Sequence, residues 1–288
     1  MSHGDRVREV DASLGGVLFC PQFAVAFALH TPLPALRPMQ LYYEPVVTLL
    51  ARPSFTTPEH LPVNWIGEST DGERLAEFAG RVCYMSQHNP AKRATRDYLD
   101  NIKKQGHGSV LEHANYTLLL EGVSRSLTHE LVRHRAGFAY SQLSQRYVDE
   151  SEASFVVPPA AIGEPALEEA WRVQIELAQQ AYVSLVERLM ERYGWVADRV
   201  HRRKMAREAA RAVLPNATET KIVVTANARA WRTMLELRAS EGAELEIRRA
   251  AIAILRLLQC EAPGFFSDFE IYQADDRREA ARVSYHKV

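Results

Sequence analysis

Residues 218–239 read Thr-Glu-Thr-Lys-Ile-Val-Val-Thr-Ala-Asn-Ala-Arg-Ala-Trp-Arg-Thr-Met-Leu-Glu-Leu-Arg-Ala, and they contain two kinds of secondary structure in succession. The β-branched residues of Thr218–Thr225 predict a strand. Asn227 supplies a turn, and the apolar spacing that follows predicts a helix from about Arg229 to Ala239. A strand that leads directly into a helix indicates a chain of the α/β class.

Hydrophobic periodicity predicts the remaining elements on either side of this stretch. We expect strands at Leu41–Leu50, Asn115–Leu120 and Phe265–Tyr272, a short strand ended by Pro158, and helices at Glu73–Tyr84, Thr95–Lys104, Ala166–Tyr193, Asp198–Val213 and Ala243–Leu258, with one more helix capped by Ser124. Cys83 lies on the apolar stripe of its helix and is expected in the core. The stripe along Ala166–Tyr193 predicts either core or subunit contact. Because no repeat or linker interrupts the chain, one domain is the simplest partition.

The composition is that of an ordinary globular protein. The chain has 288 residues, of which 47% are hydrophobic and 25% charged, so it can bury a sizeable core. Its formal net charge of −1 gives no general attraction to nucleic acid or membrane, so an anion site must be local. Cys20, Cys83 and Cys260 are irregularly spaced, which argues against a disulfide framework and favours a reducing cytoplasm.

The start of the chain differs from the rest. Residues 16–29 are largely apolar, but Pro21 interrupts them and the run is too short to span a bilayer. The segment before them lacks the basic character of a secretory signal. We expect residues 1–38 to be an extension outside the fold, either disordered or produced by an upstream start assigned in error. Residues 39–288 are expected to form the folded domain.

A second stretch, residues 133–146, is rich in basic and polar side chains. It reads Arg-His-Arg-Ala-Gly-Phe-Ala-Tyr-Ser-Gln-Leu-Ser-Gln-Arg and contains no acidic residue, whereas a solvated charged face would interleave both signs. Guanidinium groups match phosphate oxygens two at a time, and serine and glutamine satisfy the polar edges of a heterocycle. The stretch therefore predicts a site for a phosphorylated ligand. A basic group at the end of the preceding helix could also serve the helix dipole.

Two other functions remain open on the residues alone. A metal hydrolase could draw ligands from His107, Glu112, His113, His129, Glu130 and His134, although no two of these histidines have the one-turn spacing of a zinc helix, since His129 and His134 are five residues apart. An RNA-binding helix could use the arginines between Arg199 and Arg211, although interleaved acidic and apolar residues are more typical of a solvated face. We predict neither a metal site nor a nucleic-acid partner.

The 133–146 stretch resembles the signature of the flavin-dependent thymidylate synthases, in which seven residues separate Arg-His-Arg from a serine. Here eight residues lie between Arg135 and Ser144, and Gly137 could absorb the extra one in a tight turn. Residues 78–84, 106–113 and 211–241 resemble further family segments in the same order, so the similarity covers roughly residues 60–270. The resemblance implies a single α/β (α+β) domain with a mainly antiparallel sheet packed with helices.

The same resemblance implies the reductive methylation of dUMP to dTMP. Methylenetetrahydrofolate would supply the carbon, reduced FAD the hydride, and NADPH the electrons that restore the flavin. No cysteine nucleophile would take part. The implied partners are dUMP, folate and NADPH, and the implied assembly is a homotetramer whose active sites are shared between subunits.

By position, the resemblance assigns two overlapping sets of contacts. The cofactor-binding set is Ser109, Arg133, His134, Arg135, Gln142, Asn227, Ala228, Arg229 and Thr233, with Thr233 in place of the family's usual His or Asn. The substrate-binding set is Glu130, Leu131, Val132, Arg133, Gln142, Leu143, Ser144, Gln145, Arg146, Arg211 and Arg238. Ser144 has no flanking base, so it is assigned to binding. Gly108, where the family often has a larger residue, would open the wall near Ser109.

Arg238 matches the family's catalytic arginine, which favours ionisation of the uracil ring. Because an arginine is not deprotonated in proteins, it would stabilise developing negative charge rather than act as a base. Arg229 and Arg238 are nine residues apart, about two and a half helical turns. The spacing therefore predicts that the two arginines face opposite sides of their helix and serve different ligands.

Overall fold

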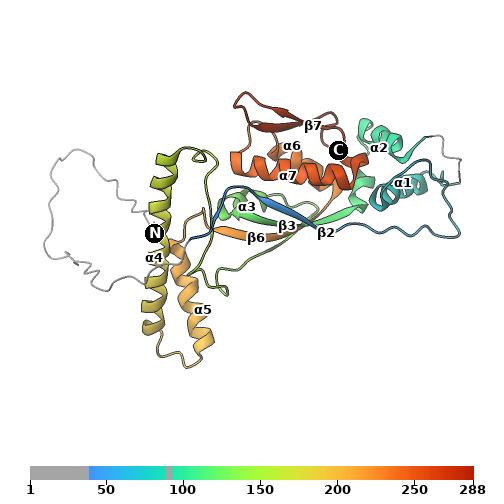
Figure 1. Cartoon of the computed structure of the whole chain (residues 1–288). Coiled ribbons are helices and arrows are strands. Elements are labelled where there is room, and N and C mark those ends of the chain that lie inside the picture. Colours follow the sequence, from blue (N-terminus) through green and yellow to red (C-terminus); the bar gives the residue numbers. More distant parts are fainter. Residues whose placement is uncertain (1–38, 89–92) are drawn as a thin grey trace, which may run out of the picture. The chain divides into compact units, whose positions relative to one another are not determined.

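The computed structural model describes residues 39–88 and 93–288, so the predictions for residues 1–38 lie outside the described residues (Figure 1). The strands are β1 (Leu41–Tyr42), β2 (Val46–Ala51), β3 (Asn115–Ser124), β4 (Phe138–Gln142), β5 (Phe155–Val156), β6 (Glu219–Asn227), β7 (Phe269–Gln273) and β8 (Glu279–Val283). The α-helices are α1 (Asp71–Cys83), α2 (Thr95–Lys104), α3 (Arg125–Leu131), α4 (Pro165–Arg192), α5 (Arg199–Ala210), α6 (Ala228–Arg238), α7 (Leu245–Glu261) and α8 (Pro263–Phe266). Two 3-10 helices, η2 (Gly108–His113) and η3 (Arg211–Val213), complete the elements named here.

The central sheet is antiparallel throughout and has the order β2-β3-β6-β4. β7 and β8 form a separate antiparallel hairpin, while β1 and β5 pair in parallel. The prediction of an α/β fold with a mainly antiparallel sheet is therefore confirmed.

One face of the sheet carries the main core. Side chains alternate along a strand, so Tyr116, Leu118 and Leu120 of β3 are buried together with Ile222 and Val224 of β6. These residues belong to the same apolar cluster as side chains of α6 and α7, and both helices contact the sheet (Figure 1). The opposite face is less covered, and Val46 and Leu50 of β2 are 48% and 51% exposed.

Several predicted elements have different bounds in the structure. The strand expected at Leu41–Leu50 is two strands, because Pro45, which lacks an N–H donor, lies in the gap between β1 and β2. The strand expected from Phe265 begins only at Phe269, since Pro263 starts the short helix α8 and Phe265 is buried in the core. Strands β4 and β8 were not predicted.

The prediction of a core position for Cys83 is wrong, whereas the mostly exposed stripe of α4 leaves the predicted subunit contact as the alternative. Cys83 is exposed, and α1 instead buries Glu73, Glu77 and Arg81. Most of their polar atoms have partners within the chain: Glu77 and Arg81 form an ion pair of 2.6 Å, and Glu73 Oε1 accepts a 2.5 Å hydrogen bond from the Gly264 N–H, whereas Glu77 Oε2 has no partner among the described residues. Along α4 only Ile175, Gln179 and Tyr182 are buried, while Leu167 and Leu177 are more than half exposed.

Candidate functional site

The fold brings the two most informative stretches of sequence together. Strand β4, inside the 133–146 stretch, pairs with β6, and Phe138 lies opposite Ala226 while Gln142 lies opposite Ile222. Because α6 starts immediately after β6, the basic segment that precedes β4 lies beside the first turn of α6. This pairing, which the sequence did not predict, creates the site.

Gly137 permits that close approach. It has a φ of +77°, and a Cβ atom added to it would lie 2.7 Å from Asn227 Nδ2 and 2.9 Å from Ala230 Cβ. Only glycine adopts this conformation readily and also fits the space. The prediction that Gly137 forms a tight turn after Arg135 is therefore confirmed.

Arg238 stands at the end of α6 in a small polar cluster. Its Nη1 atom lies 2.6 Å from Glu130 Oε2, and its Nε–H donates to His134 Nε2 over 3.1 Å. Burial and the charge of Arg238 lower the pKa of His134, so the imidazole is neutral at pH 7 and its own proton is on Nδ1. The predicted residues Glu130, His134 and Arg238 thus meet at one point.

Tyr140 holds the basic segment against β4. Its hydroxyl oxygen lies 2.9 Å from the Leu131 carbonyl oxygen and 2.7 Å from that of His134, and it can donate to either. The ring stacks on Phe138 with an interplanar angle of 4°, and burial raises the pKa of the hydroxyl. Tyr140 was not among the predicted site residues. Its position five residues after Arg135 could have indicated it only if strand β4 had been predicted.

The polar groups after β4 are only partly satisfied. Gln142 donates from Nε2 to Thr128 and Thr220, and Arg146 forms a 3.1 Å ion pair with Glu208. Among the described residues, however, Gln145 Nε2 and Arg146 Nε are buried without a hydrogen-bond partner. A buried donor without a partner is costly, so these two atoms mark a place where a polar ligand would be favourable.

A second incomplete group lies at Arg125 and Glu150, which the sequence analysis did not identify. Burial, together with the charge of Arg211, lowers the pKa of Arg125, and its Nη1 atom has no partner in the described part of the chain. Burial raises the pKa of Glu150 to about 7, while the charge of Arg125 opposes the shift and that of Glu219 adds to it. The predicted substrate contact Arg211 therefore belongs to a charged cluster whose full extent was not visible from the sequence.

Three of the predicted cofactor residues, Asn227, Arg229 and Thr233, line one cavity along α6. A cavity of about 450 Å³ is lined by Glu112, Ala136, Gly137, Asn227, Arg229, Ala230, Thr233, Glu236, Leu237 and Lys287. Arg229 Nη1 pairs with Glu112 Oε1 at 2.6 Å, whereas Arg238 pairs with Glu130. The two arginines thus have different surroundings, as their spacing predicts.

Some assigned cofactor residues have structural roles of their own. Asn227 caps α6, because its Oδ1 atom accepts a 2.8 Å hydrogen bond from the Ala230 N–H. Thr233 donates to the Arg229 carbonyl oxygen, and Ala228 is fully buried. Ser109 is exposed on η2.

Gly108 does not open the wall beside Ser109. A Cβ atom there would meet Arg229 Nε at 3.0 Å and the Val288 backbone at 3.1 Å, so the space is already filled. The expectation of an open wall at this position is wrong, because Arg229 occupies the room that the missing side chain leaves.

The remaining predicted residues follow the end of α3. Arg133 and Arg135 are exposed, and Arg133 Nε donates to the His129 carbonyl oxygen. Val132 is the C-cap of α3 and Leu131 is buried. Leu143 bonds through its backbone N–H to Lys221, and Ser144 accepts through its carbonyl oxygen from the Tyr147 and Val148 N–H groups. Leu131, Val132 and Leu143 therefore position the chain around the basic groups.

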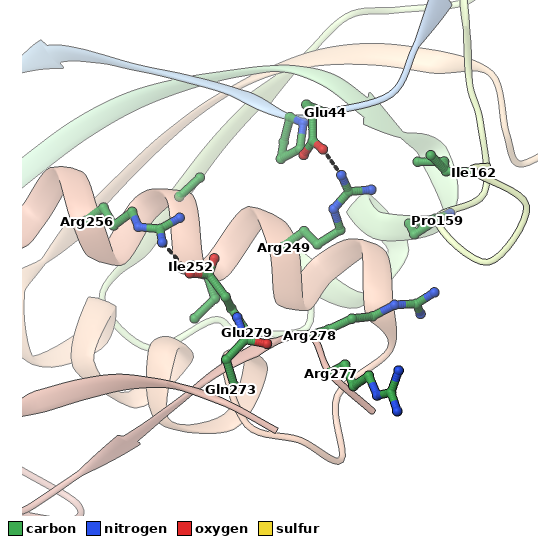
Figure 2. A pocket seen from close by; sticks show the side chains of 12 residues that line it. Glu44, Pro159, Ile162, Arg249, Ile252, Arg256, Gln273, Arg277, Arg278 and Glu279 are labelled. Carbon is green, nitrogen blue, oxygen red and sulfur yellow. Dashed lines mark hydrogen bonds and ion pairs between the residues drawn. The ribbon is translucent and has the colours of Figure 1, made fainter. Parts of the chain in front are cut away.

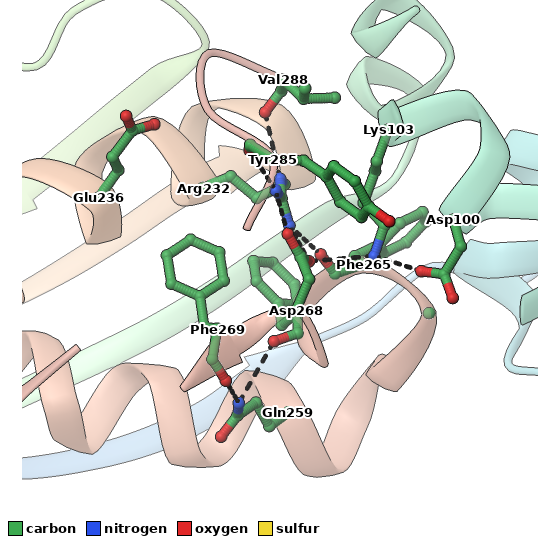
Figure 3. A network of polar contacts seen from close by, with 12 residues as sticks. Asp100, Lys103, Arg232, Glu236, Gln259, Phe265, Asp268, Phe269, Tyr285 and Val288 are labelled. Carbon is green, nitrogen blue, oxygen red and sulfur yellow. Dashed lines mark hydrogen bonds and ion pairs between the residues drawn. The ribbon is translucent and has the colours of Figure 1, made fainter. Parts of the chain in front are cut away.

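A buried ion network fixes the middle of α6 (Figure 3). Arg232, which is 2% exposed, donates from Nη1 and Nη2 to the two carboxylate oxygens of Asp268 over 2.6 and 2.9 Å. Its other hydrogen bonds go to the carbonyl oxygens of Phe265, Tyr285 and Val288. Lys103 Nζ adds a 3.0 Å contact to Asp268. Burial alone would raise the pKa of Asp268, but hydrogen bonds and charges from Arg232 and Lys103 lower it.

The structure also places the residues on which a metal hydrolase or an RNA-binding helix would depend. In the described ranges 39–88 and 93–288, no three His, Cys, Asp or Glu side chains are grouped to hold a metal ion. Several basic residues of α5 have contacts within the chain: Arg202 donates to the Val196 carbonyl oxygen and Arg207 pairs with Asp149. No helix in the part of the chain that the structure describes could cross a membrane.

Fold and site together define an enzyme of mixed α/β class with a basic, incompletely paired site. The family described as "Thymidylate synthase complementing protein", Thy1, matches residues 66–264. The flavin-dependent thymidylate synthase of Mycobacterium sp. (strain JLS) is 49% identical over 241 residues, which cover 82% of this chain and 94% of that protein. The enzymes of the same name from Mycobacteroides abscessus and Mycobacterium marinum are 48% and 47% identical over 237 residues, with the same coverage. The chain belongs to the flavin-dependent thymidylate synthase family.

Proposed function

We propose that this chain catalyses the reductive methylation of dUMP to dTMP, with methylenetetrahydrofolate as carbon donor and FAD and NADPH as reductants. Two observations carry the proposal: Arg238, Glu130 and His134 meet in one polar cluster, and the residues after β4 hold unpaired donors at Gln145 and Arg146. One group of donors suits a pyrimidine and the other a phosphate, so the site matches a pyrimidine nucleotide.

Arg238 is the proposed catalytic residue. Glu130 holds one side of its guanidinium, and neutral His134 accepts from Nε, so the plane of the group is fixed before substrate arrives. In that position it lies against the pyrimidine edge and stabilises the negative charge that develops on the ring. The arrangement requires no proton transfer from Arg238 itself.

The nucleotide is bound by side chains on several elements. Gln145, Arg146 and Ser144 follow β4, and Arg211 approaches from η3. We assign the buried unpaired donors of Gln145 and Arg146 to the substrate because dUMP supplies acceptor oxygens. Gln142 and Arg133 contact both ligands in this proposal.

We assign FAD to the cavity along α6. Its lining combines the apolar Ala136, Ala230 and Leu237 with the donors of Asn227 and Arg229, and Gly137 leaves room that a Cβ atom would fill. Ser109, His134 and Arg135 complete the proposed set. When bound in its reduced form, the flavin supplies the hydride. Arg229, held by Glu112, orients an anionic group of the cofactor.

A homotetramer with shared active sites is also part of the proposal. Large apolar side chains are exposed on several elements of the described chain, namely Val46 and Leu50 of β2, Tyr84 and Met85 after α1, Leu167, Val173 and Leu177 of α4, and Trp195 and Val200 near α5. We infer that other subunits cover some of these side chains, as happens where they form a contiguous patch. Light scattering of the purified protein would measure the assembly.

The two described cysteines, Cys83 and Cys260, are unpaired and exposed, which suits the cytoplasmic location predicted from the sequence. Neither lies in the proposed site. Residues 39–288 are the proposed catalytic domain.

A direct test is anaerobic oxidation of the reduced flavin. Protein purified with FAD and reduced by NADPH should transfer the hydride when dUMP and methylenetetrahydrofolate are both added, and the flavin absorption band should return as dTMP forms. Omission of either substrate should prevent dTMP formation. A flavin-loaded protein that binds dUMP but forms no dTMP would contradict the proposal.

A further inference from the structure

Figure 2 shows a cavity of about 550 Å³, and none of the residues assigned to dUMP or FAD lines it. It is bounded by α7, by the turn between β7 and β8, and by the residues that precede β2. Its lining is Glu44, Pro45, Pro159, Ile162, Arg249, Ile252, Ala253, Arg256, Gln273, Arg277, Arg278 and Glu279. This volume lies within the range of small-molecule sites in proteins, roughly 300–1,000 Å³.

The charges in this cavity are unequal, since four arginines face two glutamates. Arg249 pairs with Glu44, and Arg256 pairs with Glu279. For the guanidinium groups of Arg277 and Arg278, no hydrogen bond or ion pair is found among residues 39–88 and 93–288. The nearby Asp276 pairs with Arg248 and accepts from the Arg278 backbone N–H. The cavity therefore holds an excess of positive charge.

Burial and the excess of positive charge lower the pKa of Arg249. Its side chain is 26% exposed, and burial together with the charge of Arg278 lowers its pKa. An arginine stays charged at neutral pH, so the repulsion persists in the absence of a counter-charge. A bound anion between Arg249 and the β7–β8 turn would remove it.

The backbone at Arg277 adds an independent observation. Its φ is +61°, in the left-handed region that glycine adopts without strain. A long charged residue in such a conformation, with its guanidinium unpaired at a cavity wall, points to a role for the side chain that offsets the strain.

We propose that this cavity binds a nucleotide with two or more adjacent phosphate groups, at a site separate from that of dUMP. Arg277 and Arg278 hold the phosphates together with Arg249, since guanidinium groups match phosphate oxygens in pairs. The apolar wall of Pro45, Pro159 and Ile252 receives the rest of the nucleotide. The proposal does not depend on the proposed thymidylate synthesis.

Calorimetric titration of the flavin-loaded protein tests this, with dUMP present at saturation so that the substrate site is filled. ATP, dTTP and inorganic pyrophosphate are the three probes. We expect ATP or dTTP to bind, and the double substitution Arg277→Gly with Arg278→Ala to weaken binding by about tenfold or more. Arg277→Gly also relieves the backbone strain, so this variant should keep its fold.

Arg282→Ala is the matched control. Arg282 lies on the same hairpin, pairs with Glu270 at 2.8 Å and does not line the cavity, so its loss should leave binding unchanged. Failure of both nucleotides to bind, or binding that the double variant retains, would overturn the proposal. Pyrophosphate that binds as tightly as ATP and dTTP would also overturn it, because the apolar wall would then contribute nothing.

Discussion

Arg232 and Arg238 stand on the same helix, and each pairs with a carboxylate, yet their surroundings differ. A guanidinium has five N–H donors, and all five of Arg232 are used, by Asp268 and by three backbone carbonyl oxygens. Arg238 donates to Glu130 and His134, and no further acceptor is found for it in the described residues. Its side chain is 24% exposed against 2% for Arg232.

The difference between the two arginines separates a structural position on α6 from a position that keeps free donors. A fully satisfied, buried arginine has no capacity for a ligand and fixes the position of α6. A partly satisfied arginine at the end of the same helix retains free donors, which we assign to the substrate in the proposed function. Each of the following predictions changes one side of this comparison.

The largest effect is expected at Asp268. Asp268→Ala leaves Arg232 and Lys103 as buried cations without their carboxylate, so the free energy of unfolding should fall by about 3–5 kcal/mol. Urea unfolding at pH 7 of the variant and the wild type measures this difference in free energy. Asp100→Ala is the control, because Asp100 contacts the same Lys103 from a position that is 41% exposed and should cost about 1 kcal/mol or less. Equal costs at the two positions would remove the distinction between the buried network and the surface.

Arg238→Ala should act on catalysis and not on the fold. Loss of a preorganised charge at the reacting ring should raise the activation free energy by about 2–4 kcal/mol and so lower kcat/KM. Flavin absorbance should be retained, because Asn227 and Arg229 remain. In contrast, Arg229→Ala should weaken FAD binding first. If Arg238→Ala lost the flavin and still bound dUMP, the two arginines would be assigned to the wrong ligands.

Glu150→Gln should alter the pH dependence of stability. The folded-state pKa is raised from 4.5 to about 7, so the folded protein binds this proton more tightly than the unfolded chain does. The resulting stabilisation is present below about pH 4.5 and is lost as pH rises to about 7. Relative to the wild type, the variant should gain stability between pH 5 and 8, as measured by thermal unfolding in the absence of ligands. A difference that does not change with pH would contradict this.

The smallest effect is expected at the start of the chain. A protein that begins at Met39 should keep the turnover and melting temperature of the full chain, since the proposed domain spans residues 39–288. Insoluble or inactive protein would show that residues 1–38 belong to the fold.

The sequence predicted most helices because their apolar spacing and caps are local features. Ser124 caps α3 as expected, and Asn227, predicted as the turn before the helix, is the N-cap of α6. The orientation of α1 was not predictable in the same way. Glu73, Glu77 and Arg81 are buried because partners in Gly264 and within the helix satisfy them, and hydrophobic periodicity contains no information about such pairing.

The site was predictable where chemistry is concentrated in the sequence. Arg133–Arg146 identified the basic segment, but the strand within it was missed because β4 is specified by its pairing with β6 and not by β-branched residues. Arg125 and Glu150 come together only through the fold, so neither stood out by sequence pattern. Arg238 and Glu130 are 108 positions apart; the family resemblance assigned both to the substrate, but their contact with each other was not predicted.

The central claim is that the chain makes dTMP with flavin and arginine chemistry and without a cysteine nucleophile. The most direct measurement is dTMP formation by a variant in which Cys20, Cys83 and Cys260 are all replaced by alanine. It would be supplied with FAD, NADPH, dUMP and methylenetetrahydrofolate. We expect turnover close to that of the wild type. A folded, flavin-loaded variant that binds dUMP and forms no dTMP would contradict it.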